Sequence, residues 1–339
     1  MTPTSTVAPA GPRSTMPPVE TPLPGDFVGP TYRDHPERFA HELEDAARRE
    51  LGRLAAALDD GEAPAPLEPA VHAVMAEATA RTQAALRDGP GFCLIRGVPV
   101  EGRSRAALAA LYTMIGRAIG RPTAQSFDGE LITDVRDTGE SPLDPDVRLY
   151  RTRAEQDFHT DGADVIGLLC LQPARAGGAS RIVSSVRVFQ VVRALRPDLA
   201  PLLFEPWFFQ LPGARARGLP EALPRPITTF DGRKLETFFI GWYLRNAQQL
   251  ASVPPLDEAR RELLALYEAT ANDPALSLDM ELRPGDVQWL RNAFILHKRT
   301  AYEDHPEPAR KRHLLRLWLA SPQLDDRTPR FAPDGGLPR

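Results

Sequence analysis

The segment Phe158-His159-Thr160-Asp161-Gly162 places an imidazole and a carboxylate two residues apart on a stretch that is typical of an extended strand. Alternate residues of a strand point to the same face, so His159 and Asp161 can bind one metal ion together. The pair is a weak signal by itself, because a chain with seven histidines and many aspartates contains such pairs by chance. A metal site therefore needs a third ligand elsewhere in the chain.

A third candidate ligand lies in Asn292-Ala-Phe-Ile-Leu-His297-Lys-Arg299, where a histidine ends an apolar run. Two histidines and one carboxylate form the facial set of non-haem ferrous oxygenases, which leaves neighbouring coordination positions open. Such enzymes also need donors for the far carboxylate of a 2-oxo acid. The basic stretch Arg310-Lys-Arg312-His-Leu-Leu-Arg316 follows shortly after His297, and arginine is suited to a bidentate grip on a carboxylate.

With these segments in place, the sequence resembles the TauD/TfdA-like dioxygenases, which depend on ferrous iron and 2-oxoglutarate and belong to the clavaminate synthase-like superfamily. The resemblance covers roughly residues 90 to 320 and is far more specific than any single motif. It rests on five motifs in the family's order: Phe158-His-Thr-Asp161-Gly-Ala-Asp164, Gly177-Gly-Ala-Ser180, Pro284-Gly-Asp286, His297-Lys-Arg-Thr-Ala-Tyr-Glu-Asp304 and Arg310-Lys-Arg312-His-Leu-Leu-Arg316-Leu-Trp318.

The resemblance implies a role for each polar residue of these motifs. His159, Asp161 and His297 would be the metal ligands and catalytic centre. Arg312 would bind the C5 carboxylate of 2-oxoglutarate, although Arg310 and Arg316 are alternatives because the interval from His297 is longer than in the taurine enzyme. Ser180 matches a family threonine that bonds the same carboxylate, and a serine hydroxyl can replace it; otherwise Ser180 only closes a turn.

Arg316 has two interpretations. Its position matches an arginine that contacts an anionic substrate in the taurine enzyme, so the substrate could carry an anionic group. Alternatively Arg316 forms an ion pair with Asp304 or another carboxylate. Trp289 and Trp318 are interpreted as core residues.

The resemblance further implies that the cofactors are Fe(II), 2-oxoglutarate as cosubstrate, and O2. The expected function is an oxidoreductase that hydroxylates a small organic substrate and releases succinate and CO2. An intact Asp161 favours oxygen transfer over halogenation, whereas desaturation, cyclisation and bond cleavage would use the same residues. Two other classes stay open: a zinc-dependent hydrolase, since His and Asp also bind zinc, and a non-catalytic jelly-roll binding module that retains its metal site.

Composition limits the partners and the compartment. The formal net charge is −4 with a pI near 6.0, and no basic stripe is present, so neither nucleic acid nor a membrane is an expected partner. Only two cysteines occur, Cys93 and Cys170, and both lie in apolar runs. A disulfide framework is not expected, which favours a reducing cytoplasm. The sequence does not indicate the oligomeric state.

The order of elements predicts an α+β fold whose core is a double-stranded β-helix, or jelly roll, with flanking helices. Residues 1–30 are rich in proline and are predicted to be a disordered tail. Residues 31–325 should form one domain, with a helical front at 34–120 and the jelly-roll core at about 90–320, followed by a C-terminal tail at 326–339. Helices are expected at 34–60 and 68–87, and a mobile loop at 201–234 that helps to cover the site, with strands resuming at 227–230 and 235–240.

Overall fold

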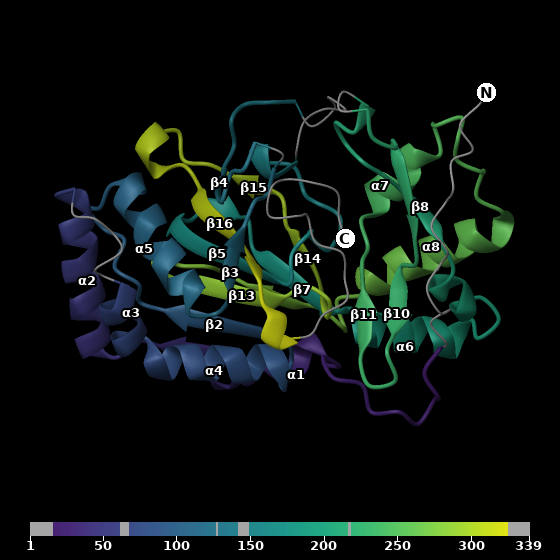
Figure 1. Cartoon of the computed structure of the whole chain (residues 1–339), viewed down its shortest axis with the longest axis horizontal. Helices are drawn as coiled ribbons and strands as arrows, with labels where there is room; N and C mark the ends of the chain where they lie inside the picture. The colour runs from purple at the N-terminus through teal and green to yellow at the C-terminus, as the bar shows by residue number, and fades with distance from the viewer. Residues whose placement is uncertain (1–15, 62–67, 127, 142–148, 216–217, 325–339) are drawn as a thin grey trace, which may run out of the picture.

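The computed structural model describes residues 16–61, 68–126, 128–141, 149–215 and 218–324. In Figure 1 the two main β-sheets lie between a group of helices from the first third of the chain and a second group from its middle. The α+β fold with a jelly-roll core that the sequence predicts is confirmed. None of the helices in the described part of the chain combines the length and the apolar character needed to cross a membrane.

The larger sheet has seven strands. Its strands pair antiparallel, except that the first pair, β1 and β2, is parallel. The order across the sheet is β1 (Ala40–Glu42), β2 (Phe92–Arg96), β13 (Val287–Arg291), β5 (Val165–Gln172), β16 (His313–Ala320) and β3 (Arg121–Thr123), with β4 (Ile132–Val135) also pairing with β16.

The smaller sheet has three antiparallel strands, in the order β12 (Leu278–Met280), β7 (Ser180–Ser184) and β14 (Ile295–Arg299). A further short pair joins β6 (Ala176–Gly177) to β15 (Tyr302–Glu303). The two main sheets contact each other through their inner faces. The Ser180 hydroxyl on β7 donates to Gln288 Oε1 on β13 at 2.8 Å. This contact joins the two layers of the jelly roll.

Strand β16 separates the two faces of the larger sheet through its alternating side chains. Leu315, Leu317 and Leu319 point outward and pack in one cluster with Leu54 and Leu111 of the front helices. The residues between them, including Arg316 and Trp318, therefore point to the interior of the jelly roll. The covering helices are α2 (Asp45–Asp59), α3 (Glu68–Val74), α4 (Ala76–Arg87) and α5 (Arg105–Arg117).

Helix α6 (Ser185–Leu195) packs on the smaller sheet, and α8 (Glu258–Ala271) packs on α6. Helix α6 follows β7 directly, and its N-cap Ser184 accepts a hydrogen bond from the backbone N–H of Arg187 at 3.0 Å. Val183, Val186 and Phe189 belong to the larger hydrophobic cluster of the protein. The smaller sheet is thus held rigidly against its helices, and the side chains of its inner face are positioned with it.

Residues 201–234, predicted as a mobile loop, contain an additional pair of strands before residue 227, so the loop prediction was wrong for the described part of that stretch. The strands predicted at 227–230 and 235–240 are confirmed, although the second is shorter than expected. Strand β8 (Trp207–Gln210) pairs with β9 (Ala222–Arg225), and β10 (Thr228–Phe230) pairs with β11 (Leu235–Thr237). Trp207 and Phe209 are buried and anchor the first hairpin. Helix α7 (Gly241–Ala247) follows, and the short helical turns are η1 (Pro36–Arg38), η3 (Leu149–Arg151), η4 (Ala200–Phe204), η6 (Pro308–Arg310) and η7 (Pro322–Leu324).

Three other predicted boundaries differ from the structure. The tail predicted at residues 1–30 is packed from residue 16 onward, because Leu23 and Phe27 are buried and α1 spans Gly29–Arg33. The first long helix begins at Asp45 instead of residue 34, since η1 and β1 come before it. The helix predicted at 68–87 is divided at Met75 into α3 and α4. The predicted tail at 326–339 lies outside the described residues.

Candidate metal and cosubstrate site

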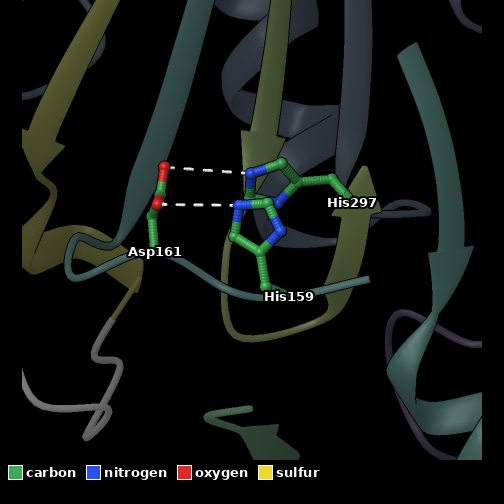
Figure 2. A group of neighbouring side chains, drawn as sticks. All are labelled: His159, Asp161 and His297. Carbon is green, nitrogen blue, oxygen red and sulfur yellow. Dashed lines mark ion pairs between the residues drawn. The ribbon is translucent and has the colours of Figure 1, made fainter. Parts of the chain in front are cut away.

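His159, Asp161 and His297 come together although they belong to distant parts of the chain (Figure 2). The backbones of His159 and His297 exchange two hydrogen bonds, of 3.0 and 2.9 Å, so the segment before β5 lies alongside β14. Nε2 of His159 lies 4.0 Å from Asp161 Oδ1, and Nε2 of His297 lies 3.8 Å from Oδ2. One candidate ligand atom from each residue lies within 4.8 Å of the other two.

The protonation states of the three side chains suit a divalent metal. Nδ1 of His159 donates to the carbonyl of Asp157 at 2.8 Å, so its Nε2 carries the lone pair that faces Asp161. Burial lowers the pKa of His159, and it lowers that of His297 to about 3. Burial alone would raise the pKa of Asp161, but the neighbouring Arg316 brings it below its ordinary value. The cluster thus presents neutral imidazoles and an ionised carboxylate, the forms that bind metal.

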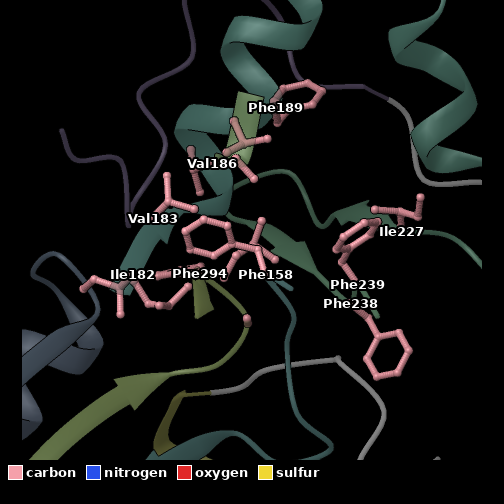
Figure 3. Close-up of a cluster of buried hydrophobic side chains, with 14 of the residues drawn as sticks. Phe158, Ile182, Val183, Val186, Phe189, Ile227, Phe238, Phe239 and Phe294 are labelled. Atoms are coloured by element: carbon pink, nitrogen blue, oxygen red, sulfur yellow. The ribbon is translucent and has the colours of Figure 1, made fainter. Parts of the chain in front are cut away.

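The segment that carries His159 and Asp161 is held on both sides of Thr160. Phe158 is buried in the cluster that also contains Phe239 (Figure 3). The Thr160 backbone N–H donates to the carbonyl of Phe239 at 2.8 Å, and its hydroxyl accepts from the Phe239 N–H at 2.9 Å. These contacts fix the extended backbone that turns both polar side chains toward His297.

Asn292 holds the same segment from the other side. Its side-chain oxygen accepts from the Asp161 backbone N–H at 2.8 Å, and its amide nitrogen donates to the Asp161 carbonyl at 2.7 Å. Asn292 is 1% exposed, so these hydrogen bonds are shielded from water. The site therefore depends on a buried amide next to the turn between β13 and β14.

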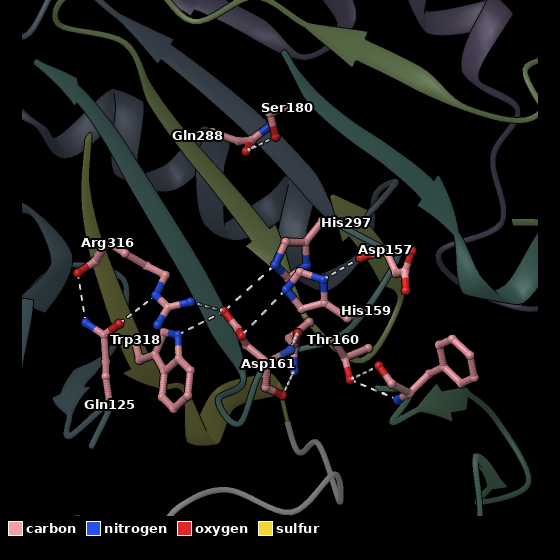
Figure 4. Close-up of polar contacts among 12 residues, drawn as sticks. Gln125, Asp157, His159, Thr160, Asp161, Ser180, Gln288, His297, Arg316 and Trp318 are labelled. Atoms are coloured by element: carbon pink, nitrogen blue, oxygen red, sulfur yellow. Dashed lines mark hydrogen bonds and ion pairs between the residues drawn. The ribbon is translucent and has the colours of Figure 1, made fainter. Parts of the chain in front are cut away.

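The carboxylate of Asp161 is oriented by two donors on β16 (Figure 4). Arg316 Nη1 and Trp318 Nε1 both donate to Oδ2, at 3.2 and 3.1 Å. Arg316 also donates through Nε to Gln125 Oε1 at 2.7 Å. The carboxylate partner of Arg316 is thus Asp161, and not Asp304, which accepts from a backbone N–H.

Arg312 and Ser180 line the same cavity as the three candidate ligands. Arg312 is 4% exposed, and its buried Nη1 has no hydrogen-bond partner among the described residues. Its guanidinium lies over the ring of Tyr302, 5.1 Å from the centroid, and burial lowers its pKa. Arg310, the alternative anchor, is exposed in η6 and pairs with Glu307. Arg312 is therefore available for an anion in the cavity, whereas Arg310 points to the surface.

The cavity has a volume of about 480 Å³. Most of the charged side chains that line it are positive. Six basic residues line it, against the two carboxylates of Asp161 and Glu221. The basic residues are Arg215, Arg225, Lys298, Arg299, Arg312 and Arg316. A cavity with this charge balance suits anionic ligands.

Sequence reasoning missed several residues that shape the site. Trp318, interpreted as a core residue, is buried but also donates to Asp161. Gln125 and Asn292 carry no motif signal, because their partners are distant in the sequence. Arg299 follows His297 at strand spacing and lines the cavity, so the alternation of β14 could have identified it. Burial and the neighbouring Arg312 lower its pKa to about 10.

The fold and this arrangement of donors define a non-haem iron oxygenase. The family described as "Taurine catabolism dioxygenase TauD, TfdA family" matches residues 68–318, so the chain belongs to this family. It is an oxidoreductase that uses Fe(II), 2-oxoglutarate and O2. This result favours the dioxygenase over the zinc hydrolase and the non-catalytic module.

Individual relatives agree with this class. The chain is 30% identical over 240 residues to FR-33289 synthase of Streptomyces rubellomurinus, covering 69% of this chain and 70% of the relative. It is 29% identical over 249 residues to a uridine-5'-phosphate dioxygenase of a Streptomyces species, covering 67% and 84%. The structure of asparagine oxygenase with Fe(II), hydroxyasparagine and succinate is similar in fold, with a TM-score of 0.67 and 21% identity over 84% of this chain and 94% of that one.

Proposed function

We propose that His159, Asp161 and His297 bind the Fe(II) and that Arg312, with Ser180, binds the C5 carboxylate of 2-oxoglutarate. The protein would then hydroxylate a small organic substrate in the cavity between the two sheets. The observation that carries this proposal is that the three candidate metal ligands and the buried guanidinium group of Arg312, whose Nη1 has no partner among the described residues, line the same cavity.

The donor set fits ferrous iron. Two neutral imidazoles and one carboxylate are the facial set of this class, and the second nitrogen of His159 is already fixed by a backbone carbonyl. When bound, Fe(II) with 2-oxoglutarate and O2 supplies the oxidising power of the reaction. The chain itself orients the ligands. Thr160 and Asn292 hold the segment that carries His159 and Asp161, and Arg316 orients the Asp161 carboxylate.

Arg312 is supported as the anchor by its burial and by the space beside it. A Cβ on Gly178, which has a φ of +73°, would lie 3.0 Å from Arg312 Nε. A glycine at this position therefore accommodates both the turn and the arginine side chain. The Ser180 hydroxyl donates to Gln288 in this structure, and it would rotate to donate to the carboxylate.

A substrate that carries an anionic group is part of this proposal. It is supported by the excess of basic residues in the cavity and by the phosphate in the name of the uridine-5'-phosphate dioxygenases. Oxygen transfer is proposed as the outcome because Asp161 retains its carboxylate. A cytoplasmic location is also proposed, supported by two free and buried cysteines.

Anaerobic addition of Fe(II) and 2-oxoglutarate tests the assignment of both sites. The wild-type protein should develop the weak visible charge-transfer band of the chelate, and His159→Ala and Asp161→Ala should abolish it. His72→Ala is the matched control, because His72 is an exposed histidine on α3. If the wild type shows no band, or if His159→Ala retains it, the proposed metal site is wrong.

A further inference from the structure

Arg225, the last residue of β9, is a cation that lines the cavity. Its Nε and Nη1 are buried and have no hydrogen-bond partner, and no carboxylate pairs with it among the residues that the structure describes. Its guanidinium carbon lies 4.0 Å from the centroid of the Phe238 ring. Burial lowers the pKa of Arg225 to about 9.

Arg291 and Arg96, which do not line the cavity, are satisfied by the fold. Arg291 donates to the carbonyls of Leu86 and Leu324, and Arg96 pairs with Asp286 at 3.0 Å. A buried guanidinium group without such partners is costly. At the wall of a cavity, this cost is removed when an anion binds there. Arg225 therefore has the properties of a binding residue and no structural role that the described contacts reveal.

Arg225 lies close to the segment that carries the proposed metal ligands His159 and Asp161. Leu223 and Arg225 lie on one face of β9, and Phe209 on β8 is the cross-strand partner of Leu223. Phe209 contacts Phe238 edge to face, with ring centroids 5.0 Å apart. Phe238 precedes Phe239, which is hydrogen-bonded to Thr160. A single aromatic ring therefore connects the arginine to the segment that carries His159 and Asp161.

Arg225 belongs to a different part of the cavity wall from the proposed 2-oxoglutarate anchor. Arg312 precedes β16 and lies with Ser180 of β7, on the two main sheets, whereas Arg225 is on the β8–β9 hairpin. Glu221 also lines the cavity, but its carboxylate forms no ion pair with Arg225. Three arginines of the cavity wall, Arg225, Arg299 and Arg312, thus have guanidinium nitrogens without a partner among the described residues. Arg299 and Arg312 belong to the main sheets or their edge, whereas Arg225 lies apart on the hairpin with apolar side chains beside it.

We propose that Arg225 binds the anionic oxygen group of the substrate, a carboxylate, sulfonate, phosphonate or phosphate, while the apolar part of the substrate packs on Phe209, Leu223 and Phe238. A bidentate guanidinium grip suits all four groups. This inference rests on the proposed function, because it requires the substrate to enter the cavity beside the iron and 2-oxoglutarate.

The first experiment uses the wild-type protein with Fe(II) and saturating 2-oxoglutarate, without O2. Binding of n-butylphosphonate, n-butanesulfonate, pentanoate and 1-butanol is measured by calorimetry, and the charge-transfer band is followed in parallel. The anions should bind at least about 10-fold more tightly than 1-butanol, since a charge-assisted hydrogen-bond pair is lost with the alcohol. The order among the three anions identifies the group preferred. Equal binding of 1-butanol, or loss of the band through displacement of 2-oxoglutarate, would overturn the inference.

The second experiment compares variants at Arg225. Arg225→Met should weaken anion binding by about 10- to 100-fold and leave 1-butanol unchanged, and Arg225→Lys should give an intermediate affinity. Arg193→Met is the matched control, because Arg193 also stacks on a phenylalanine, 5.1 Å from the Phe189 centroid, but does not line the cavity.

The readouts separate this inference from the proposed function. A retained charge-transfer band in Arg225→Met establishes that the protein is folded and loads iron and 2-oxoglutarate. Wild-type anion affinity in that variant would overturn the role of Arg225 and leave the iron site intact. Absence of the band in the wild type would instead overturn the proposed function. If Arg225→Met does not fold, the Arg225→Lys variant and the wild-type preference for anions over 1-butanol decide the question.

Discussion

Arg316 and Asp161 form a buried ion pair in which Nη1 donates to Oδ2 at 3.2 Å. Trp318 donates to the same oxygen, whereas Oδ1 receives no hydrogen bond from the part of the chain that the structure describes. The two donors therefore fix the carboxylate and leave Oδ1, which lies 4.0 Å from His159 Nε2, for a metal ion. An arginine that the family resemblance associates with a substrate anion here orients a proposed metal ligand.

Arg316→Met should lower the affinity for Fe(II) by about 10- to 100-fold, the usual cost of losing a partner that orients a ligand. The Asp161 carboxylate would lose its charged donor and keep only Trp318. Iron binding is measured anaerobically by titration in the presence of 2-oxoglutarate. Arg181→Met is the control, because Arg181 pairs with Asp279 outside the cavity. Unchanged iron affinity would show that Trp318 alone orients Asp161.

Arg312→Ala should raise the KM for 2-oxoglutarate by about 10- to 100-fold, because a buried charge-assisted pair with the carboxylate is lost. The Fe(II) requirement should change little, since Arg312 contacts none of the three proposed ligands. Succinate formation at varied 2-oxoglutarate and varied Fe(II) separates the two effects. Arg310→Ala, which removes an exposed arginine nearby, should behave like the wild type; an effect of Arg310→Ala without one of Arg312→Ala would reverse the assignment.

Asn292→Ala should destabilise the protein by about 2–4 kcal/mol, because it leaves the Asp161 N–H and carbonyl buried without partners. Denaturation in urea gives the free energy of unfolding, and iron affinity should fall with it. Gln249→Ala, which removes an exposed amide, should change the stability by less than about 0.5 kcal/mol. Equal stability of the two variants would contradict the role of Asn292 as a clamp.

The two cysteines predict a stability change at high pH. Burial raises the pKa of the Cys93 thiol to about 11 and that of Cys170 to about 12. The folded-state thiol pKa values lie above those of the unfolded chain. The two thiols therefore contribute fully to the free energy of unfolding below about pH 9, and this contribution is lost as the pH rises through 11 and 12. The native thiols should not react with Ellman's reagent at about pH 8, and both should react in urea. Cys93→Ala/Cys170→Ala should lose less stability than the wild type between about pH 8 and 11; equal losses would contradict this.

The motifs that predict the site are short-range patterns, and they succeed where the chemistry requires local spacing. His159 and Asp161 share a strand face, and His297 ends an apolar strand, so the sequence by itself suggests three donors. The contacts that orient them could not be predicted. In the folded structure Asn292 and Trp318 contact Asp161, and Gln125 contacts its partner Arg316. These residues are distant in the sequence, so no local spacing pattern indicates the contacts.

The same limit applies to the elements. The alternation of β16 and the apolar β5 are periodic, so the jelly roll was predictable. Residues 201–234 contain prolines and an Arg/Gly stretch that suggested a loop, yet Trp207 and Phe209 pack into the core and make a hairpin. Arg225 became a candidate only when its lack of a partner was visible in three dimensions. Likewise, Leu23 and Phe27 are buried because the rest of the fold provides their pocket.

The hairpin β10–β11 contains a buried ion pair whose lysine also contacts η7, and this gives a last prediction. Lys234 Nζ lies 3.0 Å from Glu236 Oε1 and donates to the carbonyl of Leu324 at 2.8 Å, and both side chains are at most 3% exposed. Lys234→Met should destabilise the protein by about 3–5 kcal/mol, because Glu236 loses its buried counter-charge. Lys234→Met/Glu236→Leu should recover much of this loss, since replacing both charges by apolar groups removes the desolvation cost. Urea denaturation of the single and double variants measures the coupling, and a double variant less stable than Lys234→Met would mean that the pair stabilises the hairpin through contacts other than its charges.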